Sequence, residues 1–191
     1  MKKRTIALAL PFLLLACNNE GKDSVEKADS ANEAKMDSGS TTSKTLQTDE
    51  ASSSFLVKAA DGGMTEVRLG ELAQQKASSK MVKDYGTMLI HDHSAANDKV
   101  KALAAQRNVT LPDAPGNENQ EKIDKLAKRT GKDFDKSFMD AMQSDHKKDI
   151  DMFKDASNKV NDADIKAFVD NTIPTLQMHL DSANVIRKGL K

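Results

Sequence analysis

The sequence is poor in aromatic residues: it has no tryptophan, one tyrosine and six phenylalanines among 191 residues. Runs of β-branched or aromatic residues are also scarce, whereas Ala, Lys, Asp, Met and Leu dominate the second half. This composition disfavours β-sheet and favours α-helix. Basic residues form no stripe interleaved with aromatic residues, so we expect no nucleic-acid partner.

The chain has a single cysteine, Cys17, which excludes a disulfide within the chain. Three basic residues at 2–4 precede an apolar stretch at 6–15 that is too short to span a bilayer. The stretch ends in Leu-Leu-Ala-Cys at 14–17, which resembles the lipobox of bacterial lipoproteins. The pattern predicts that residues 1–16 are a signal peptide and that Cys17 is acylated. An ordinary signal peptide cut near residue 16 is the alternative.

Two or three acyl chains on Cys17 would anchor the chain stably, so we expect the membrane to be a partner through this lipid anchor. Asn18 and Asn19 follow the cysteine, and neither position is aspartate. By resemblance to lipoprotein sorting in enteric bacteria, this implies an outer-membrane lipoprotein of the cell envelope that faces the periplasm. The sequence identifies no protein partner.

Residues 17–50 are rich in Ser, Thr, Asp, Glu, Lys, Asn and Ala and show almost no apolar periodicity. Such a segment buries too little apolar surface to order itself, so we interpret it as the lipidated cysteine followed by a disordered linker. A weak helical bias is present around residues 25–36. Residues 51–191 form the predicted domain.

From residue 53 onward, apolar residues recur with a helical period. The pattern predicts four long helices and one short helix, at 53–77, 79–107, 117–128, 132–160 and from a cap at Asn161 or Asp162 to about 188. Pro112 and Pro115 interrupt the chain between the second and third long helices. Short connections join the outer pairs, so the predicted fold is an all-α, ferritin-like four-helix bundle with one long connection between its second and third helices. An up-down bundle with a decorated loop is the close alternative.

One polar residue lies near the middle of each apolar stripe: Glu66, His93, His146 and His179. Residues at mid-height on neighbouring helices can meet in one layer, whichever way the helices run. His91, by contrast, is predicted to point away from His93 towards solvent.

Imidazoles and one carboxylate suit one Zn, Cu, Fe or Mn ion, and Asp92 and Asp145 could support such ligands from behind. The alternative is a structural layer without metal, in which the histidines hydrogen-bond one another, the glutamate and these two aspartates. No Glu-x-x-His motif of di-iron proteins is present, and neither is a nucleophile–base motif, a phosphate-binding loop or an H-E-x-x-H motif. An enzyme is therefore the least favoured reading.

Several short motifs resemble a bacterial family known as domain of unknown function 4142. They lie, in order, at residues 63–66, 69–73, 82–88, 92–93, 111–112, 134–142, 145–146 and 174–179. The resemblance implies a ferritin-like helical bundle in the cell envelope and no particular activity. We therefore predict a non-enzymatic binding or structural module. A metal-binding bundle is the alternative, and a metal-dependent enzyme is the least favoured of the three.

Overall fold

The computed structural model describes residues 23–37 and 48–190. Cys17, the expected signal peptide and residues 18–22 and 38–47 of the expected linker lie outside this part. The described chain folds into six helices: α1 (Ser24–Asp37), α2 (Glu50–Lys76), α3 (Lys80–Gln106), α4 (Asn117–Ala127), α5 (Gly131–Lys159) and α6 (Ala163–Gly189). Within the described ranges no helix is long and apolar enough to cross a membrane.

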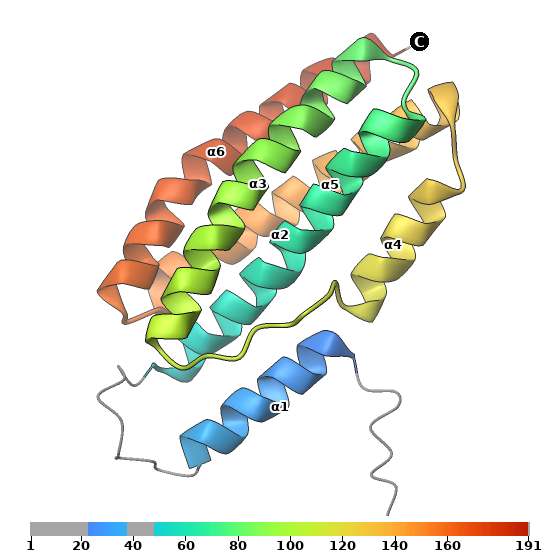
Figure 1. Cartoon of the computed structure of the whole chain (residues 1–191). Coiled ribbons are helices and arrows are strands. Elements are labelled where there is room, and N and C mark those ends of the chain that lie inside the picture. Colours follow the sequence, from blue (N-terminus) through green and yellow to red (C-terminus); the bar gives the residue numbers. More distant parts are fainter. Residues whose placement is uncertain (1–22, 38–47, 191) are drawn as a thin grey trace, which may run out of the picture.

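The four long helices, α2, α3, α5 and α6, lie side by side (Figure 1). Their bounds agree with the predicted ranges to within one helical turn, which confirms the all-α class. The turns between α2 and α3 and between α5 and α6 are short, so each pair is antiparallel. The connection from α3 to α5 is long and contains α4, which packs alongside α2.

Aspartate side chains fix the ends of three long helices. Asp49 caps α2 by accepting a hydrogen bond from the backbone N–H of Ser52, and Asp162 caps α6 in the same way, as predicted. The buried Asp135 of α5 accepts hydrogen bonds from the backbone N–H groups of Ser78 and Ser79. This carboxylate ties the α2–α3 turn to the start of α5.

Helices α2 and α3 approach each other closely at a pair of glycines. A Cβ atom placed on Gly70 would lie 2.7 Å from the carbonyl oxygen of Gly86, and one on Gly86 would lie 2.9 Å from the carbonyl oxygen of Gly70. Only residues without a Cβ allow this backbone contact. The close crossing explains why two helix-weakening glycines occur in the middle of long helices.

Helix α1 corrects the interpretation of a disordered linker for residues 24–37, where the sequence showed only a weak helical bias. It lies beside the α3–α4 connection (Figure 1) and buries Ala28, and Asn32 pairs with the backbone of Thr110. The Asn32 Nδ2 donates to the Thr110 carbonyl at 2.9 Å, and the Thr110 N–H donates to Asn32 Oδ1 at 2.7 Å. At its start, Asp23 accepts from the Asn117 N–H at 2.9 Å. Polar contacts to a loop therefore supply the stability that apolar periodicity did not reveal.

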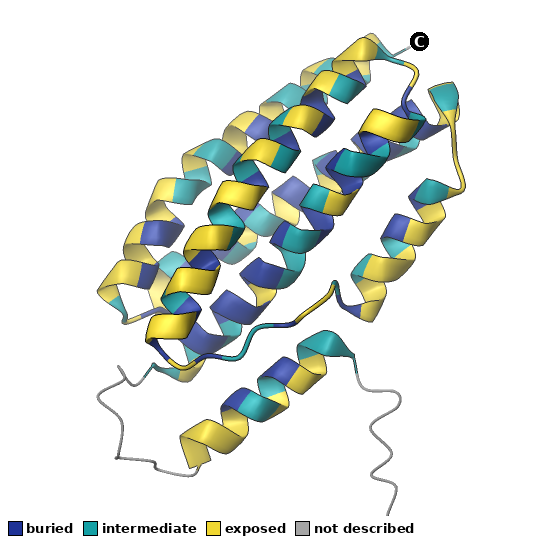
Figure 2. Ribbon diagram, in the orientation of Figure 1, coloured by how far each residue is buried: buried dark blue, intermediate teal, exposed yellow. Residues whose placement is uncertain are grey.

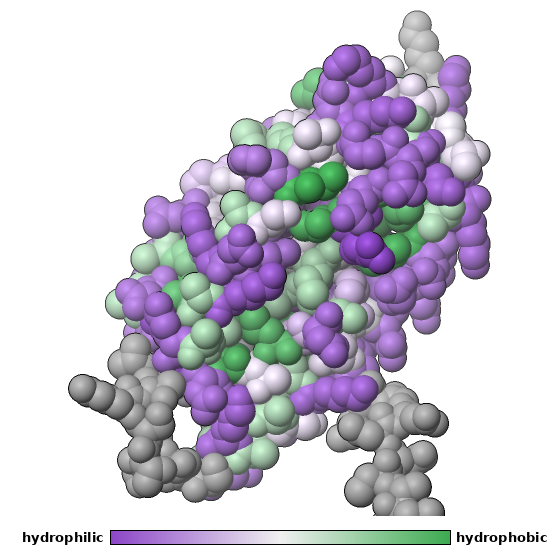
Figure 3. All heavy atoms as spheres, viewed as in Figure 1, coloured by the Kyte–Doolittle hydropathy of each residue, from purple (hydrophilic) through white to green (hydrophobic). Residues whose placement is uncertain are grey.

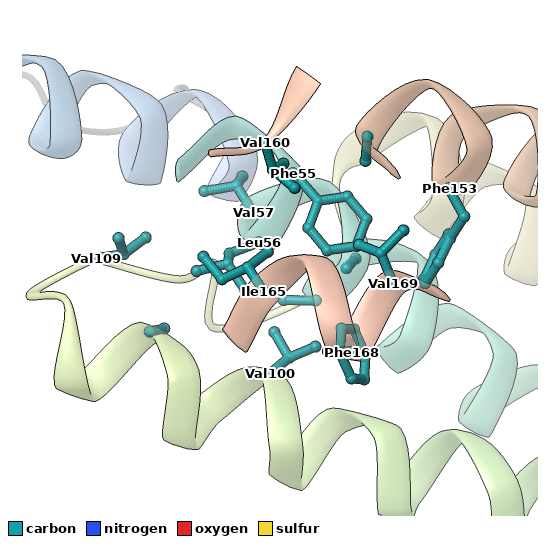
Figure 4. Packing of buried hydrophobic residues seen from close by; sticks show 14 of the residues in the cluster. Phe55, Leu56, Val57, Val100, Val109, Phe153, Val160, Ile165, Phe168 and Val169 are labelled. Atoms are coloured by element: carbon teal, nitrogen blue, oxygen red, sulfur yellow. The ribbon is translucent and has the colours of Figure 1, made fainter. Parts of the chain in front are cut away.

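The buried faces of the long helices turn inward (Figure 2) and form two hydrophobic clusters. One cluster, shown in Figure 4, centres on Phe55, Phe153 and Phe168, whose ring centroids lie 5.0–6.3 Å apart. The other contains the stacked rings of Phe134 and Phe138. The face of the molecule seen in Figure 3 is largely hydrophilic, with scattered hydrophobic areas.

Candidate metal centre

Three of the four predicted inward residues meet in the interior. His93 from α3, His146 from α5 and His179 from α6 are all buried, and their ring centroids lie 5.1–5.9 Å apart. One ring nitrogen from each lies within 4.8 Å of the corresponding nitrogen of the other two. In the part of the chain that the structure describes, this is the group of His, Cys, Asp and Glu side chains whose spacing suits a metal ion.

A chain of hydrogen bonds fixes two of these rings. The Nδ1 of His146 lies 3.0 Å from the Met142 carbonyl oxygen and its Nε2 lies 3.1 Å from Nδ1 of His179. The Nε2 of His179 lies 2.9 Å from Oδ2 of Asp92. The phenol of Tyr85 donates to the backbone carbonyl of His179 at 3.2 Å and so supports α6 at this level.

The proton positions in this chain follow from what each partner can do. A carbonyl oxygen only accepts, so Nδ1 of His146 carries the proton and its Nε2 presents a lone pair. His179 then faces that lone pair on one side and the Asp92 carboxylate on the other. Two neutral imidazoles carry two N–H protons in total. The three contacts, to the Met142 carbonyl, between the two rings and to Asp92, need one proton each. The cluster therefore has a place for one additional positive charge.

Burial opposes a proton in that place. It lowers the pKa of His93 to about 3, with the neighbouring His146 and His179 lowering it further. Burial is also the main cause of the lowered pKa values of His146 and His179, although the Asp92 hydrogen bond acts in the opposite direction on His179. Neutral imidazole is the form that binds metal ions. A bound cation would supply the positive charge that the hydrogen-bond geometry favours without the extra proton that burial disfavours.

His93 differs from the other two histidines because its Nε2 is buried and has no hydrogen-bond partner within the described chain. A buried polar atom without a partner costs about 1–3 kcal/mol, and such atoms are rare in stable proteins. An unpaired nitrogen beside two other imidazoles is therefore the observation most specific to ligand binding.

Glu66 reaches the same level from α2 but does not join the three nitrogens. Its Oε1 lies 3.9 Å from Nδ1 of His146, the ring nitrogen that faces away from His179. Its Oε2 is buried and has no hydrogen-bond partner among the residues that the structure describes. Burial, with a smaller contribution from the negative charge of Asp145, raises the pKa of Glu66 to about 8. The glutamate is thus protonated at neutral pH, and its expected role as a ligand stays a prediction.

The two aspartates expected to support the ligands lie in different surroundings. Asp92 contacts His179 directly, and although burial raises its pKa, hydrogen bonds from His91 and His179 lower it overall. Asp145 makes no hydrogen bond to a histidine; it forms an ion pair with Lys122 of α4, N to O 2.9 Å. Asp92 therefore contacts a candidate metal ligand through a hydrogen bond, whereas Asp145 makes no such contact among the described residues.

The sequence pattern did not reveal Asp149, Lys122 or Tyr85 as neighbours of this layer. Asp149 lies one helical turn beyond His146, and burial, together with the charge of Glu66, raises its pKa to about 7. A half-buried aspartate among surface-facing charges of α5 carries no signal that separates it from them. Lys122 is brought to the site by α4, whose docking cannot be read from periodicity.

A groove of about 500 Å³ leads from the surface to the histidines between α3 and α6. Ala96, Phe168 and Leu176 line its apolar part, and His93, His179 and Asp92 lie along it. On the other side of His93 is a second cavity of only about 30 Å³. The groove therefore gives the buried layer a path to solvent.

The family described as "Domain of unknown function (DUF4142)" matches residues 26–186, which is most of the chain. The chain belongs to the DUF4142 family. This confirms the resemblance carried by the short motifs. No curated protein is similar enough to this DUF4142 chain to count as a match.

Among solved structures, the DUF4142 chain is similar to a DUF305 fragment from Deinococcus radiodurans, with a TM-score of 0.68 and 8% identity over 76% of this chain and 100% of that one. It is also similar to CopM in its Cu(II)-bound form, with a TM-score of 0.60 and 16% identity over 73% of this chain and 97% of that one. CopM in a silver-bound form gives a TM-score of 0.61, with 17% identity over 72% and 96% of the two chains. At these identities the likeness shows a shared helical fold.

Proposed function

We propose that this DUF4142 protein binds one transition-metal ion through His93, His146 and His179, on a ferritin-like four-helix scaffold. The observation that carries the proposal is the buried, unpartnered Nε2 of His93 beside two imidazoles whose contacts call for one more positive charge. Three histidines form a known protein ligand set, and the Asp92 carboxylate behind His179 is the kind of outer partner that orients a ligating ring.

Among the divalent ions considered, Cu(II) is the one that we favour. Sites built from nitrogen ligands bind first-row divalent ions in an order that peaks at copper. CopM, which shares the fold at low identity, was solved with Cu(II) and with silver. Zn(II) suits the same ligands and is the second choice.

The single tyrosine provides the assay. The chain has no tryptophan, and the Tyr85 ring centroid lies 6.4 Å from that of His146, so Cu(II) bound at the histidines should quench almost all intrinsic fluorescence. Titration of the full chain in detergent should saturate at one ion per chain, and inductively coupled plasma mass spectrometry should count the same ion. A chain that stays metal-free with both Cu(II) and Zn(II) would overturn the proposal.

The variant His93→Leu separates metal binding from a purely structural layer. Because the His93 Nε2 makes no hydrogen bond, leucine should leave the metal-free protein at least as stable while abolishing Cu(II) binding. The matched control is Met142→Leu, a buried apolar exchange in the same region, which should keep binding. A purely structural layer is favoured by the His146–His179–Asp92 chain, and it predicts that neither the unmodified chain nor His93→Leu binds Cu(II) and that added metal leaves both melting temperatures unchanged.

The cell-envelope location belongs to the same proposal and is supported by the sequence around Cys17 alone. We propose that the cysteine is acylated and anchors the domain to the outer membrane. Labelling of growing cells with radioactive palmitate should mark the chain, and the variant Cys17→Ser should lose the label and fractionate with soluble periplasmic proteins. Label retained in the Cys17→Ser variant would contradict acylation at this residue.

A further inference from the structure

His91 is the one histidine that the proposed metal centre leaves unused, and the structure connects it to that centre. Its side chain is 83% exposed on α3, and its Nδ1 lies 2.7 Å from Oδ1 of Asp92. The other oxygen of the same carboxylate lies 2.9 Å from Nε2 of the fully buried His179. One carboxylate therefore touches an imidazole in solvent and an imidazole in the core.

This arrangement has little structural value on the solvent side. A contact between a carboxylate and a histidine as exposed as His91 contributes little to stability, because solvent screens the charges. The pair nevertheless presents an imidazole nitrogen and a carboxylate oxygen at one point of the surface, and these are donor types that copper and zinc accept.

The position of the pair matters because Asp92 lines the α3–α6 groove together with His93 and His179. The second cavity beside His93, at about 30 Å³, has room for little more than a single water molecule and gives no comparable passage. Two other charged side chains line the groove: Asp164, which is paired with Arg107, and Lys99. The acidic end beside His91 is thus the favourable entrance for a cation, and Lys99 is the group that repels one.

We propose that His91 and Asp92 form a surface capture site for the metal ion and that the α3–α6 groove is the route from there to the three buried histidines. The inference rests on the proposed function, because it supplies the loading step of the same centre. His91 affects only the rate of metal loading, because it no longer contacts the ion once the ion has reached the buried histidines.

The test measures the rate at which the metal-free full chain, in detergent, takes up Cu(II) supplied as its glycine complex, with stopped-flow quenching of Tyr85 as the signal. His91→Ala should slow loading at least fivefold while the chain still binds one ion at equilibrium. Ser94→Ala, an exposed change on the same helix outside the groove, should load at the rate of the unmodified chain. Lys99→Gln should load faster because it removes the repelling charge.

The route is tested separately by narrowing the groove. Thr175→Phe adds bulk to its lining one turn from His179 and should slow loading, whereas Gln177→Phe adds the same bulk on the exposed side of α6 and should not. Equal rates for His91→Ala and Ser94→Ala, or loss of equilibrium binding in His91→Ala, would overturn the capture site while leaving the metal centre intact. If the unmodified chain binds no Cu(II), the proposed function itself fails and no loading rate exists to compare.

Discussion

Replacing Glu66 by glutamine should stabilise the metal-free protein, and the gain should depend on pH. The carboxyl is buried, one of its oxygens has no hydrogen-bond partner, and its pKa is raised from 4.5 to about 8. Because the pKa of Glu66 is higher in the folded than in the unfolded state, at pH values between the two pKa values the carboxyl is protonated in the folded state and ionised in the unfolded state. Glu66 therefore destabilises the folded protein, and this destabilisation becomes larger as pH rises through this range.

The size of the effect follows from the shift. Each unit of pKa difference corresponds to about 1.4 kcal/mol, so the penalty is roughly 3 kcal/mol at pH 7 and a little under about 1 kcal/mol at pH 5. Glutamine has nearly the shape of a protonated glutamate and does not ionise. Glu66→Gln should therefore gain about 3 kcal/mol at pH 7 and less than about 1 kcal/mol at pH 5.

The measurement is urea unfolding followed by circular dichroism at pH 5, 6, 7 and 8 in the presence of a chelator. The lowered pKa values of the three histidines also make stability depend on pH, but these groups are present in both proteins and cancel in the difference. Asp149 cancels only in part, because the charge of Glu66 helps to raise its pKa. Glu71→Gln, at a side chain 44% exposed on the same helix, should change stability little at any pH. A Glu66→Gln gain that is equal at pH 5 and pH 7 would refute the reasoning.

Three further changes test how the long helices and α1 are held together. Gly86→Ala should cost about 2 kcal/mol in chemical denaturation despite alanine's better helix propensity, because its Cβ would meet the backbone of α2; an increase in stability would contradict the close crossing. Arg107→Met should cost about 3 kcal/mol because it leaves the carboxylate of Asp162 without the guanidinium that pairs with it at 2.6 Å, and a neutral result in the same assay would show that the pair is replaceable. Asn32→Ala should free the backbone of Thr110 and speed protease cleavage of the α3–α4 connection, whereas unchanged cleavage would mean that α1 does not hold this loop.

Much of the fold could be predicted because the long helices carry their own signals. Apolar residues at helical spacing marked α2, α3, α5 and α6, and prolines and an aspartate cap marked where helices end. At α1 the sequence showed only a weak helical bias, and the docking of this helix could not be predicted. A contact that fixes it is the Asn32 amide paired with a loop backbone, and a single asparagine in a polar segment looks the same whether it is paired or hydrated.

The sequence predicted which helix face each site residue occupies and at which level along the bundle it lies, but it did not predict how the imidazole rings are oriented. Helical spacing brought His93, His146 and His179 to one layer, since positions on one face at mid-length must meet when helices pack. The side of the His146 ring on which Glu66 lies depends on a side-chain rotamer, which periodicity does not determine. Asp149 was missed for a different reason: its burial arises from packing among several helices and not from its position on α5.

The docking of α1 sets how far the domain can travel from an anchor. For a chain held in a membrane at Cys17, only six peptide links separate the lipid from Asp23, which is hydrogen-bonded to the start of α4. Six links span at most about 22 Å, whereas the 33 links from Cys17 to the start of α2 could reach about 110 Å. In such a chain, an attached α1 would hold the domain close to the membrane surface, and release of α1 would let the same domain move several times farther from it.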